Sequence, residues 1–194
     1  MLKKILLSLS FLLVVFTLTY TLNPFSNEMF EFHDETQPAR IQQFTQEILS
    51  GHIPPRIAPD FSFGMGYPVF TFYAPFTYWV GALFVLSGFT IVQSVKILFA
   101  LGLIGAFTGM YLLLRRFFNE PSSLVGSTVY VTIPYMAVEI FVRGNIGELW
   151  YLALLPWVLL AIFKMDLYPV KSTFIISVLA MSFLFTVHNV LSLV

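Results

Sequence analysis

Long apolar runs alternate with short polar breaks along this chain, and the runs have the length of membrane-spanning helices. A helix needs about 20 mostly apolar residues to cross roughly 30 Å of hydrocarbon. The pattern predicts spans at 5–22, 90–114, 121–137, 146–163 and 172–187. We therefore expect an all-α integral membrane protein with about five transmembrane helices.

A polar stretch, 23–66, separates the first span from the next apolar segment. Four apolar residues within it recur at helical spacing: Ile41, Phe44, Ile48 and Leu49. This spacing predicts a short amphipathic helix, and Gly51 predicts its end, because glycine readily takes the left-handed conformation that terminates helices. The apolar stripe of this helix could lie on the membrane surface.

The segment 67–89 is long and apolar enough to span, but prolines and glycines interrupt it and nine of its residues are aromatic. Aromatic side chains concentrate at the membrane interface. If the segment stays at the outer surface, six of the ten basic residues face the cytoplasm: Lys3, Lys4, Arg115, Arg116, Lys164 and Lys171. If it spans, only four do: Lys3, Lys4, Lys96 and Arg143. The positive-inside rule favours the first arrangement, with a cytoplasmic N-terminus and a large first extracytoplasmic loop.

The sequence predicts one membrane domain, 1–194. It comprises the first span, an extracytoplasmic loop and juxtamembrane segment at 23–89, and four further spans within 90–187. A signal peptide is the alternative for the first span. However, the run exceeds the usual length of about 7–15 residues and ends without a small-residue cleavage site. Because the chain stops inside an apolar run, we expect an N-terminal fragment of a longer polytopic protein.

Composition narrows the function classes. Hydrophobic residues make up 58% and charged residues only 10%, against roughly 25% charged in soluble domains. The formal net charge of +0 argues against nucleic acid as a partner. Without cysteine, the chain has no disulfides, thiol nucleophiles or thiolate metal ligands. A membrane lipid is therefore the partner that the composition supports.

The predicted topology brings polar groups to the outer face. His33, Asp34 and Glu35 follow the first span, and Asp34 could act as a general base near the bilayer surface. A solvated acidic loop is the alternative. His33 with Asp34 or Glu35 is a weak metal site, because adjacent residues rarely bind one ion together.

Two further groups face the same side. Arg143 could hold a phosphate through charge-assisted hydrogen bonds, or it could extend to the lipid headgroups. Asn145 and Glu148 have the spacing of a capping box, which would account for Glu148 without a functional role. His188, with Asn189, could bind a polar headgroup or sit in the interface.

Several short motifs, in this order, resemble the GT-C superfamily of membrane glycosyltransferases. More narrowly, they resemble bacterial membrane proteins related to 6-pyruvoyl-tetrahydropterin synthase, although no residue here supports pterin chemistry. The motifs are His33-Asp34, Arg40, Ser50–Arg56, the run Gly64–Pro75 that includes Tyr73, Tyr111 with Arg115, Pro134-Tyr135, Arg143-Gly144-Asn145, Leu155-Pro156 and His188-Asn189.

The resemblance implies an enzyme of the cytoplasmic membrane that moves a sugar from a polyprenyl-phosphate donor to an acceptor hydroxyl at the outer face. Asp34 matches the catalytic position, with Glu35 as its substitute. The residues implied to bind substrate or phosphate are Arg143, Arg40, Arg56, His188 and Tyr73. A divalent cation is a candidate for stabilising the leaving phosphate, with His33 as a weak ligand.

Two other functions stay open. A carrier or flippase for a lipid-linked substrate would use the same outer charges for binding alone. The spans nevertheless carry little buried charge and show no repeat, which counts against a transporter. A non-catalytic membrane assembly subunit would tolerate replacement of Asp34 and Arg143. The sequence predicts neither the sugar, nor the acceptor, nor the oligomeric state.

Overall fold

The computed structural model describes residues 9, 12, 13, 16, 20, 22–26, 28–73 and 75–188. Throughout this part of the chain the regular elements are helices, with one isolated β-bridge between Ala58 and Tyr67. The all-α prediction is therefore confirmed for the described residues. The predicted first span, 5–22, lies largely outside them.

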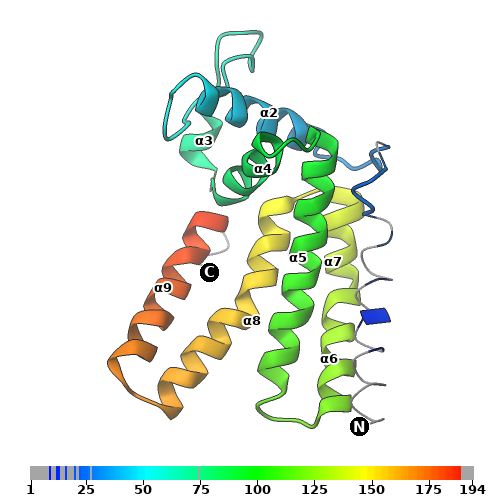
Figure 1. Ribbon diagram of the computed structural model, residues 1–194, viewed down its shortest axis with the longest axis vertical. Coiled ribbons are helices and arrows are strands. Elements are labelled where there is room, and N and C mark those ends of the chain that lie inside the picture. The colour runs from blue at the N-terminus through cyan, green and yellow to red at the C-terminus, as the bar shows by residue number, and fades with distance from the viewer. Residues whose placement is uncertain are drawn as a thin grey trace.

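Antiparallel helices form the body of the protein (Figure 1). The helix α5 (Ile91–Leu114) packs between α6 (Glu120–Thr132) and α8 (Ile146–Leu167), and α9 (Lys171–Val187) packs on the other side of α8. The loops that join α5 to α6 and α8 to α9 lie at the same end (Figure 1). These helices match the four predicted spans to within a few residues, except at the end of α6.

The contact between α5 and α8 is close because glycines of α5 face large side chains of α8. A Cβ at Gly102 would lie 2.8 Å from Leu149, and the side chain of Trp157 covers Gly109. The indole nitrogens of Trp150 and Trp157 donate to backbone carbonyls of α5 at 2.9 Å each. Small residues that let helices approach are typical of packing within membranes.

The predicted span 121–137 contains a bend. After Thr132 the chain bends by 43° into α7 (Pro134–Val138) and the π-helical turn η1 (Glu139–Arg143). Pro134 causes the break, because proline lacks an N–H and disfavours helical conformation in the preceding residue; Ile133 accordingly has ψ 146°.

Two helices, α5 and α8, are long and apolar enough to cross a membrane, and the bent segment from α6 to η1 would be a third if it counts as one span. The last helix, α9, is apolar but has 17 residues. The described residues thus contain two or three candidate spans, and the total of five stays a prediction.

The predicted amphipathic helix is confirmed as α2 (Thr36–Leu49). It ends as Gly51 predicts: Gly51 has φ +83°, its N–H donates to Ile48 O, and the His52 N–H donates to Glu47 O. Two residues of its apolar stripe, Ile41 and Phe44, are 0% exposed, whereas Leu49 is 71% exposed. The helix packs on α4 and α5, and contact of its exposed end with a membrane stays a prediction.

The aromatic segment forms two short helices, α3 (Val69–Phe72) and α4 (Phe76–Leu86). With 11 residues, α4 is about 16 Å long, which is too short to cross a bilayer. It lies beside α2 at one end of the bundle (Figure 1). This arrangement agrees with the predicted non-spanning segment, whereas its depth in a membrane stays a prediction.

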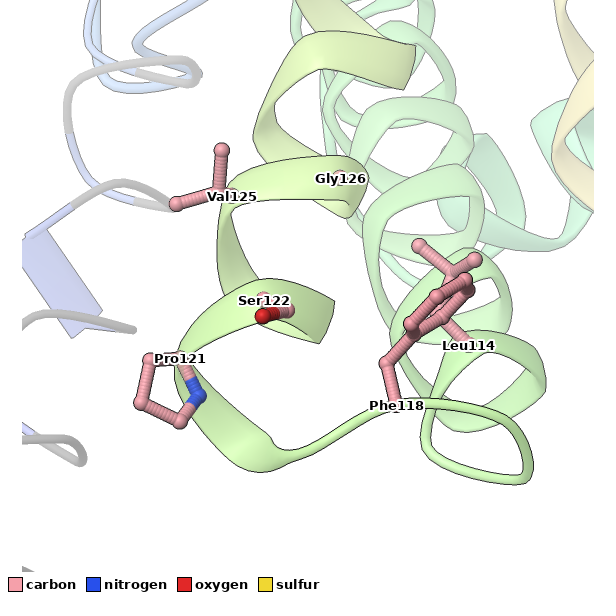
Figure 2. Close-up of a pocket in the computed structure, with 6 residues that line it drawn as sticks. All are labelled: Leu114, Phe118, Pro121, Ser122, Val125 and Gly126. Atoms are coloured by element: carbon pink, nitrogen blue, oxygen red, sulfur yellow. The ribbon is translucent and has the colours of Figure 1, made fainter.

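The bundle has two unlike ends. The polar end carries α2, α3, α4, the turn between η1 and α8, and His188 (Figure 1). The basic end carries Arg115 and Arg116, which follow α5, and Lys164 in the last turn of α8. An apolar hollow of about 490 Å³ lies at the basic end (Figure 2), lined by Leu114, Phe118, Pro121, Ser122, Val125 and Gly126.

Candidate functional site

Two main-chain hydrogen bonds fix the position of Asp34 at the polar end. The N–H of His33 donates to Val142 O at 2.8 Å, and the N–H of Asp34 donates to Arg143 O at 3.0 Å. The segment that follows the predicted first span therefore pairs with the turn before α8. This pairing joins two groups of polar side chains, one around Asp34 and one around Arg143.

The Asp34 cluster consists of Asp34, Thr36, Gln37, Arg40, Tyr73 and Tyr78. Asp34 Oδ2 accepts hydrogen bonds from Gln37 Nε2 at 2.8 Å and from Arg40 Nη1 at 3.1 Å. Asp34 Oδ1 accepts one from the Thr36 hydroxyl. Because α2 begins at Thr36, its first turns bring the Gln37 and Arg40 side chains back over the carboxylate.

Two tyrosines hold Arg40. Its guanidinium carbon lies 4.9 Å from the centre of the Tyr73 ring, and Nη1 donates to the Tyr78 hydroxyl at 3.4 Å. Burial raises the pKa of Tyr78 to about 12, so this hydroxyl is neutral at physiological pH. The Asp34 side chain is 28% exposed and that of Arg40 is 14% exposed. Asp34 is thus the more accessible member of the pair.

The Arg143 cluster consists of Tyr135, Glu139, Arg143, Asn145, Glu148 and His188. Arg143 Nη1 donates to Glu139 at 2.6 Å and to Glu148 at 2.8 Å, while Nη2 donates to Glu148 at 2.8 Å. Glu148 also accepts from the Tyr135 hydroxyl at 2.7 Å and from the Asn145 amide at 2.8 Å. One guanidinium therefore serves two carboxylates.

His188 lies at the edge of this cluster, with Nε2 3.9 Å from Glu148 Oε1. It directly follows the last residue of α9. Burial lowers the pKa of His188, which leaves the imidazole neutral at neutral pH. A neutral imidazole can both donate and accept a hydrogen bond.

The backbone before α8 is irregular for reasons that the sequence supplies. The turn η1 ends at Gly144, which has φ +67°, and a Cβ at this position would collide with the ring of Phe32. The Asn145 N–H donates to Glu139 O at 2.9 Å. Such π-helical turns occur frequently at functional sites.

The predicted cap of α8 is confirmed in part. The Asn145 side chain accepts from the Glu148 N–H at 3.1 Å, as an N-cap does. The reciprocal half of the capping box is missing, because the Asn145 N–H bonds Glu139 O and the Glu148 carboxylate faces Arg143. Helix capping alone therefore does not account for Glu148.

The Arg143 cluster places two carboxylates, those of Glu139 and Glu148, against one guanidinium. Glu139 is 0% exposed. Its Oε2 is buried and has no hydrogen-bond partner in the described part of the chain. A buried polar atom without a partner is uncommon in native proteins and marks a place where a ligand, water or proton is needed.

The structure brings most of the predicted site residues together. Asp34, Arg40 and Tyr73 form one cluster, and Arg143 and His188 belong to the other. Glu35 is the exposed residue before α2, and its side chain makes no capping bond. Arg56 lies in the exposed loop after α2.

No metal site supports the weak ligand assignment of His33. His33 is exposed, and the described residues include no group of three or more His, Asp or Glu side chains placed to hold one ion. The residue itself contributes its backbone N–H to the pairing with Val142.

Sequence reasoning missed several of the contacts that complete the site. Glu139 is four residues before Arg143, a spacing that could have signalled the ion pair. Gln37 and Arg40 lie on the same face of α2, and their helical spacing in the sequence could have predicted this. Tyr78 and Tyr135 carried no comparable local signal, because their contacts come from distant parts of the chain.

Comparisons with known proteins give one finding. No curated protein and no solved structure matches the chain. The model of a family described as "6-pyruvoyl-tetrahydropterin synthase related domain; membrane protein" matches residues 70–194. This range contains the Arg143 cluster and more than half of the chain, while Asp34 lies before it. The chain therefore belongs to the family of membrane proteins related to 6-pyruvoyl-tetrahydropterin synthase.

Proposed function

We propose that this protein is a GT-C-type glycosyltransferase that moves a sugar from a polyprenyl-phosphate donor to an acceptor hydroxyl at the outer face of the cytoplasmic membrane. The observation that carries the proposal is the fixed position of Asp34. Its backbone pairs with the Arg143 turn, so an accessible carboxylate stands at the polar end of an apolar bundle. A substrate with a polar head and a lipid tail fits such a surface.

Asp34 is the proposed general base, and Oδ1 is the oxygen best suited to the role. Oδ2 accepts two hydrogen bonds, from Gln37 and Arg40, whereas Oδ1 accepts one, from Thr36. The acceptor hydroxyl would give its proton to Oδ1 as its oxygen bonds the anomeric carbon. The bond from that carbon to the donor phosphate would break, and the phosphate would keep the electron pair.

The Arg143 cluster is proposed to stabilise charge during this step. Glycosyl transfer develops positive charge on the sugar ring, as in glycoside hydrolysis. The two carboxyl groups that share Arg143, Glu139 and Glu148, are placed to interact with that charge. Arg143 remains the proposed phosphate contact through its exposed part, since its side chain is 44% exposed, although both Nη atoms already donate to carboxylates. The described residues include no group of three or more His, Asp or Glu side chains placed to hold a divalent cation, so no step is assigned to a metal.

The test uses the longest natural reading frame that contains this segment, purified in detergent. Each variant receives a panel of polyprenyl-phosphate sugars, and released polyprenyl phosphate is quantified. Asp34→Asn should lower release by about 10²–10⁴-fold, the usual contribution of a general base. The matched control is Asp166→Asn, the same chemical change at an exposed position near the basic end of α8, which should keep wild-type turnover.

The other functions predict different results. Donor binding without release would indicate a carrier, and neither binding nor release across the panel would indicate an assembly subunit. An Asp34→Asn variant that keeps most of its turnover would remove Asp34 from the mechanism, even if the enzyme class is correct.

A further inference from the structure

A buried lysine without a carboxylate partner lies outside the two clusters. Lys96, in the second turn of α5, is 3% exposed. Its Nζ donates to two backbone carbonyls, Ser26 O at 2.8 Å and Asn23 O at 3.3 Å. An ammonium group has three donors, and a buried charge is costly unless an opposite charge compensates it. Within the described residues no ion pair involves Lys96, so its charge lacks a counterion there.

A cavity of about 320 Å³ opens beside Lys96. Its other lining residues come from the segment before α2: Tyr20, Asn23, Ser26, Glu28, Met29 and Phe30. Glu28 is exposed, whereas Lys96 is buried, so the negative charge lies nearer the solvent than the positive charge. The cavity therefore presents separated charges of opposite sign without a salt bridge to neutralise them.

Aromatic rings separate this cavity from the candidate site. Phe30 lines the cavity, and its ring lies 5.6 Å from that of Phe99, 5.3 Å from that of Phe32 and 5.6 Å from that of Phe141. Phe32 in turn directly precedes the His33-Asp34 segment. The cavity is consequently a neighbour of the Asp34 cluster and does not share its polar side chains.

We propose that this cavity binds the headgroup of a zwitterionic phospholipid, with the phosphate on Lys96 Nζ and the headgroup amine on the Glu28 carboxylate. The third donor of Lys96 is available for a phosphate oxygen, and charge-assisted hydrogen bonds of this kind are among the strong ones. The aromatic ring of Tyr20, which lines the cavity and is 66% exposed, offers apolar surface for the rest of the lipid. The proposal does not depend on glycosyl transfer.

The purified full chain, in a detergent without phosphate, is titrated with bicelles that contain dioleoyl phosphatidylethanolamine, phosphatidylglycerol or phosphatidylcholine. Native mass spectrometry counts bound lipid and gives its Kd. The wild type should bind phosphatidylethanolamine most tightly, because its primary amine can donate to Glu28 and a quaternary amine cannot. Equal affinity for the three lipids would overturn the proposal.

Variants separate the two charges. Lys96→Met should weaken binding of phosphatidylethanolamine and of phosphatidylglycerol by about tenfold or more, whereas Lys96→Arg should retain binding. Glu28→Gln should remove the preference for phosphatidylethanolamine and leave phosphatidylglycerol binding intact. Lys164→Met, at the basic end, is the matched control and should change neither Kd.

The remaining outcomes would each overturn the assignment of this cavity to a phospholipid. If Lys96 only clamps the 23–26 turn, Lys96→Met will lower the unfolding temperature and leave the lipid Kd unchanged, which overturns the proposal. If Lys96→Met does not fold, the Glu28→Gln variant tests the proposal instead, because Glu28 is exposed. An unaltered preference for phosphatidylethanolamine in Glu28→Gln would exclude the assigned contact and overturn the proposal. Displacement of the lipid by equimolar water-soluble phosphoethanolamine would assign the cavity to a soluble ligand instead.

Discussion

The polar and basic ends of the bundle use their charged residues in opposite ways. At the polar end, Arg143 bonds carboxylates from two elements, and Arg40 bonds groups from the start of α2 and from α4. At the basic end, the contacts of Arg115 with other described residues are to close neighbours in the chain, Phe118 O at 2.8 Å and Glu120 at 3.6 Å. The contact of Arg40 with Tyr78 joins two separate helices and so fixes their geometry, whereas the Arg115 contacts stay within the end of α5 and the start of α6.

The backbone is also less regular at the polar end than at the basic end. The polar end contains a π-helical turn and residues with positive φ, including Gly144. The basic end has ordinary helix termini, such as the Asn119 cap of α6, beside an apolar hollow (Figure 2). Irregular backbone combined with polar side chains that hydrogen-bond one another is the pattern expected where a protein positions chemistry.

The largest difference in stability should come from one glycine at each end. Gly144→Ala should lower the free energy of unfolding by about 3 kcal/mol, because it strains a left-handed backbone and places a Cβ against the Phe32 ring. Gly126→Ala should cost less than about 1 kcal/mol, since its Cβ meets only the end of the Leu114 side chain beside the hollow. Thermal unfolding in detergent compares the two variants. Equal losses of stability would contradict the expectation that the backbone at the polar end is the more constrained of the two.

Removal of one arginine charge from each end should give the next largest difference in stability. Arg143→Gln leaves Glu139 and Glu148 without their shared partner and should cost about 2 kcal/mol, less than a fully buried pair because Arg143 is 44% exposed. Arg116→Gln should change stability by less than about 0.5 kcal/mol, as surface substitutions usually do. Chemical denaturation of the two variants measures both effects. A larger loss of stability in Arg116→Gln than in Arg143→Gln would contradict the structural role assigned to Arg143.

The smallest expected effect concerns a single hydroxyl. Tyr135→Phe removes one hydrogen bond to the Glu148 carboxylate and should cost about 1 kcal/mol, since Glu148 keeps Arg143 and Asn145 as partners. Tyr168→Phe, an exposed position after α8, should be neutral and serves as the control. Thermal unfolding distinguishes them if the expected loss is present. A neutral Tyr135→Phe would show that the network tolerates a missing donor.

The fold was predictable where the cause is local. The helix ends at Gly51 and Asn145 follow from the residues themselves, and four later helices follow from apolar length. The break at Pro134 was also a local signal, but the apolar run continues across it, so hydropathy alone conceals the bend. Burial of Ile41 and Phe44 could not be predicted, because a buried apolar stripe and a membrane-facing one have the same spacing.

The candidate site was predictable as a set of residues and less so as an arrangement. The predicted topology put Asp34, Arg143 and His188 on one side, and the structure brings them to one end through the Asp34–Arg143 main-chain hydrogen bond and the His188–Glu148 contact. The contacts that define their roles join positions far apart in sequence, such as Arg40 with Tyr78 and Tyr135 with Glu148. Nothing in one sequence fixes such pairs, because they depend on how the helices pack.

The pairing of His33 and Asp34 with Val142 and Arg143 uses main-chain atoms alone. Main-chain hydrogen bonds do not depend on which side chains occupy the paired positions. Residues beside Asp34 can therefore change during evolution while the carboxylate stays in place. Searches for distant relatives should accordingly look for a short extended segment docked on the turn before this helix, and not for a conserved string of letters around the aspartate.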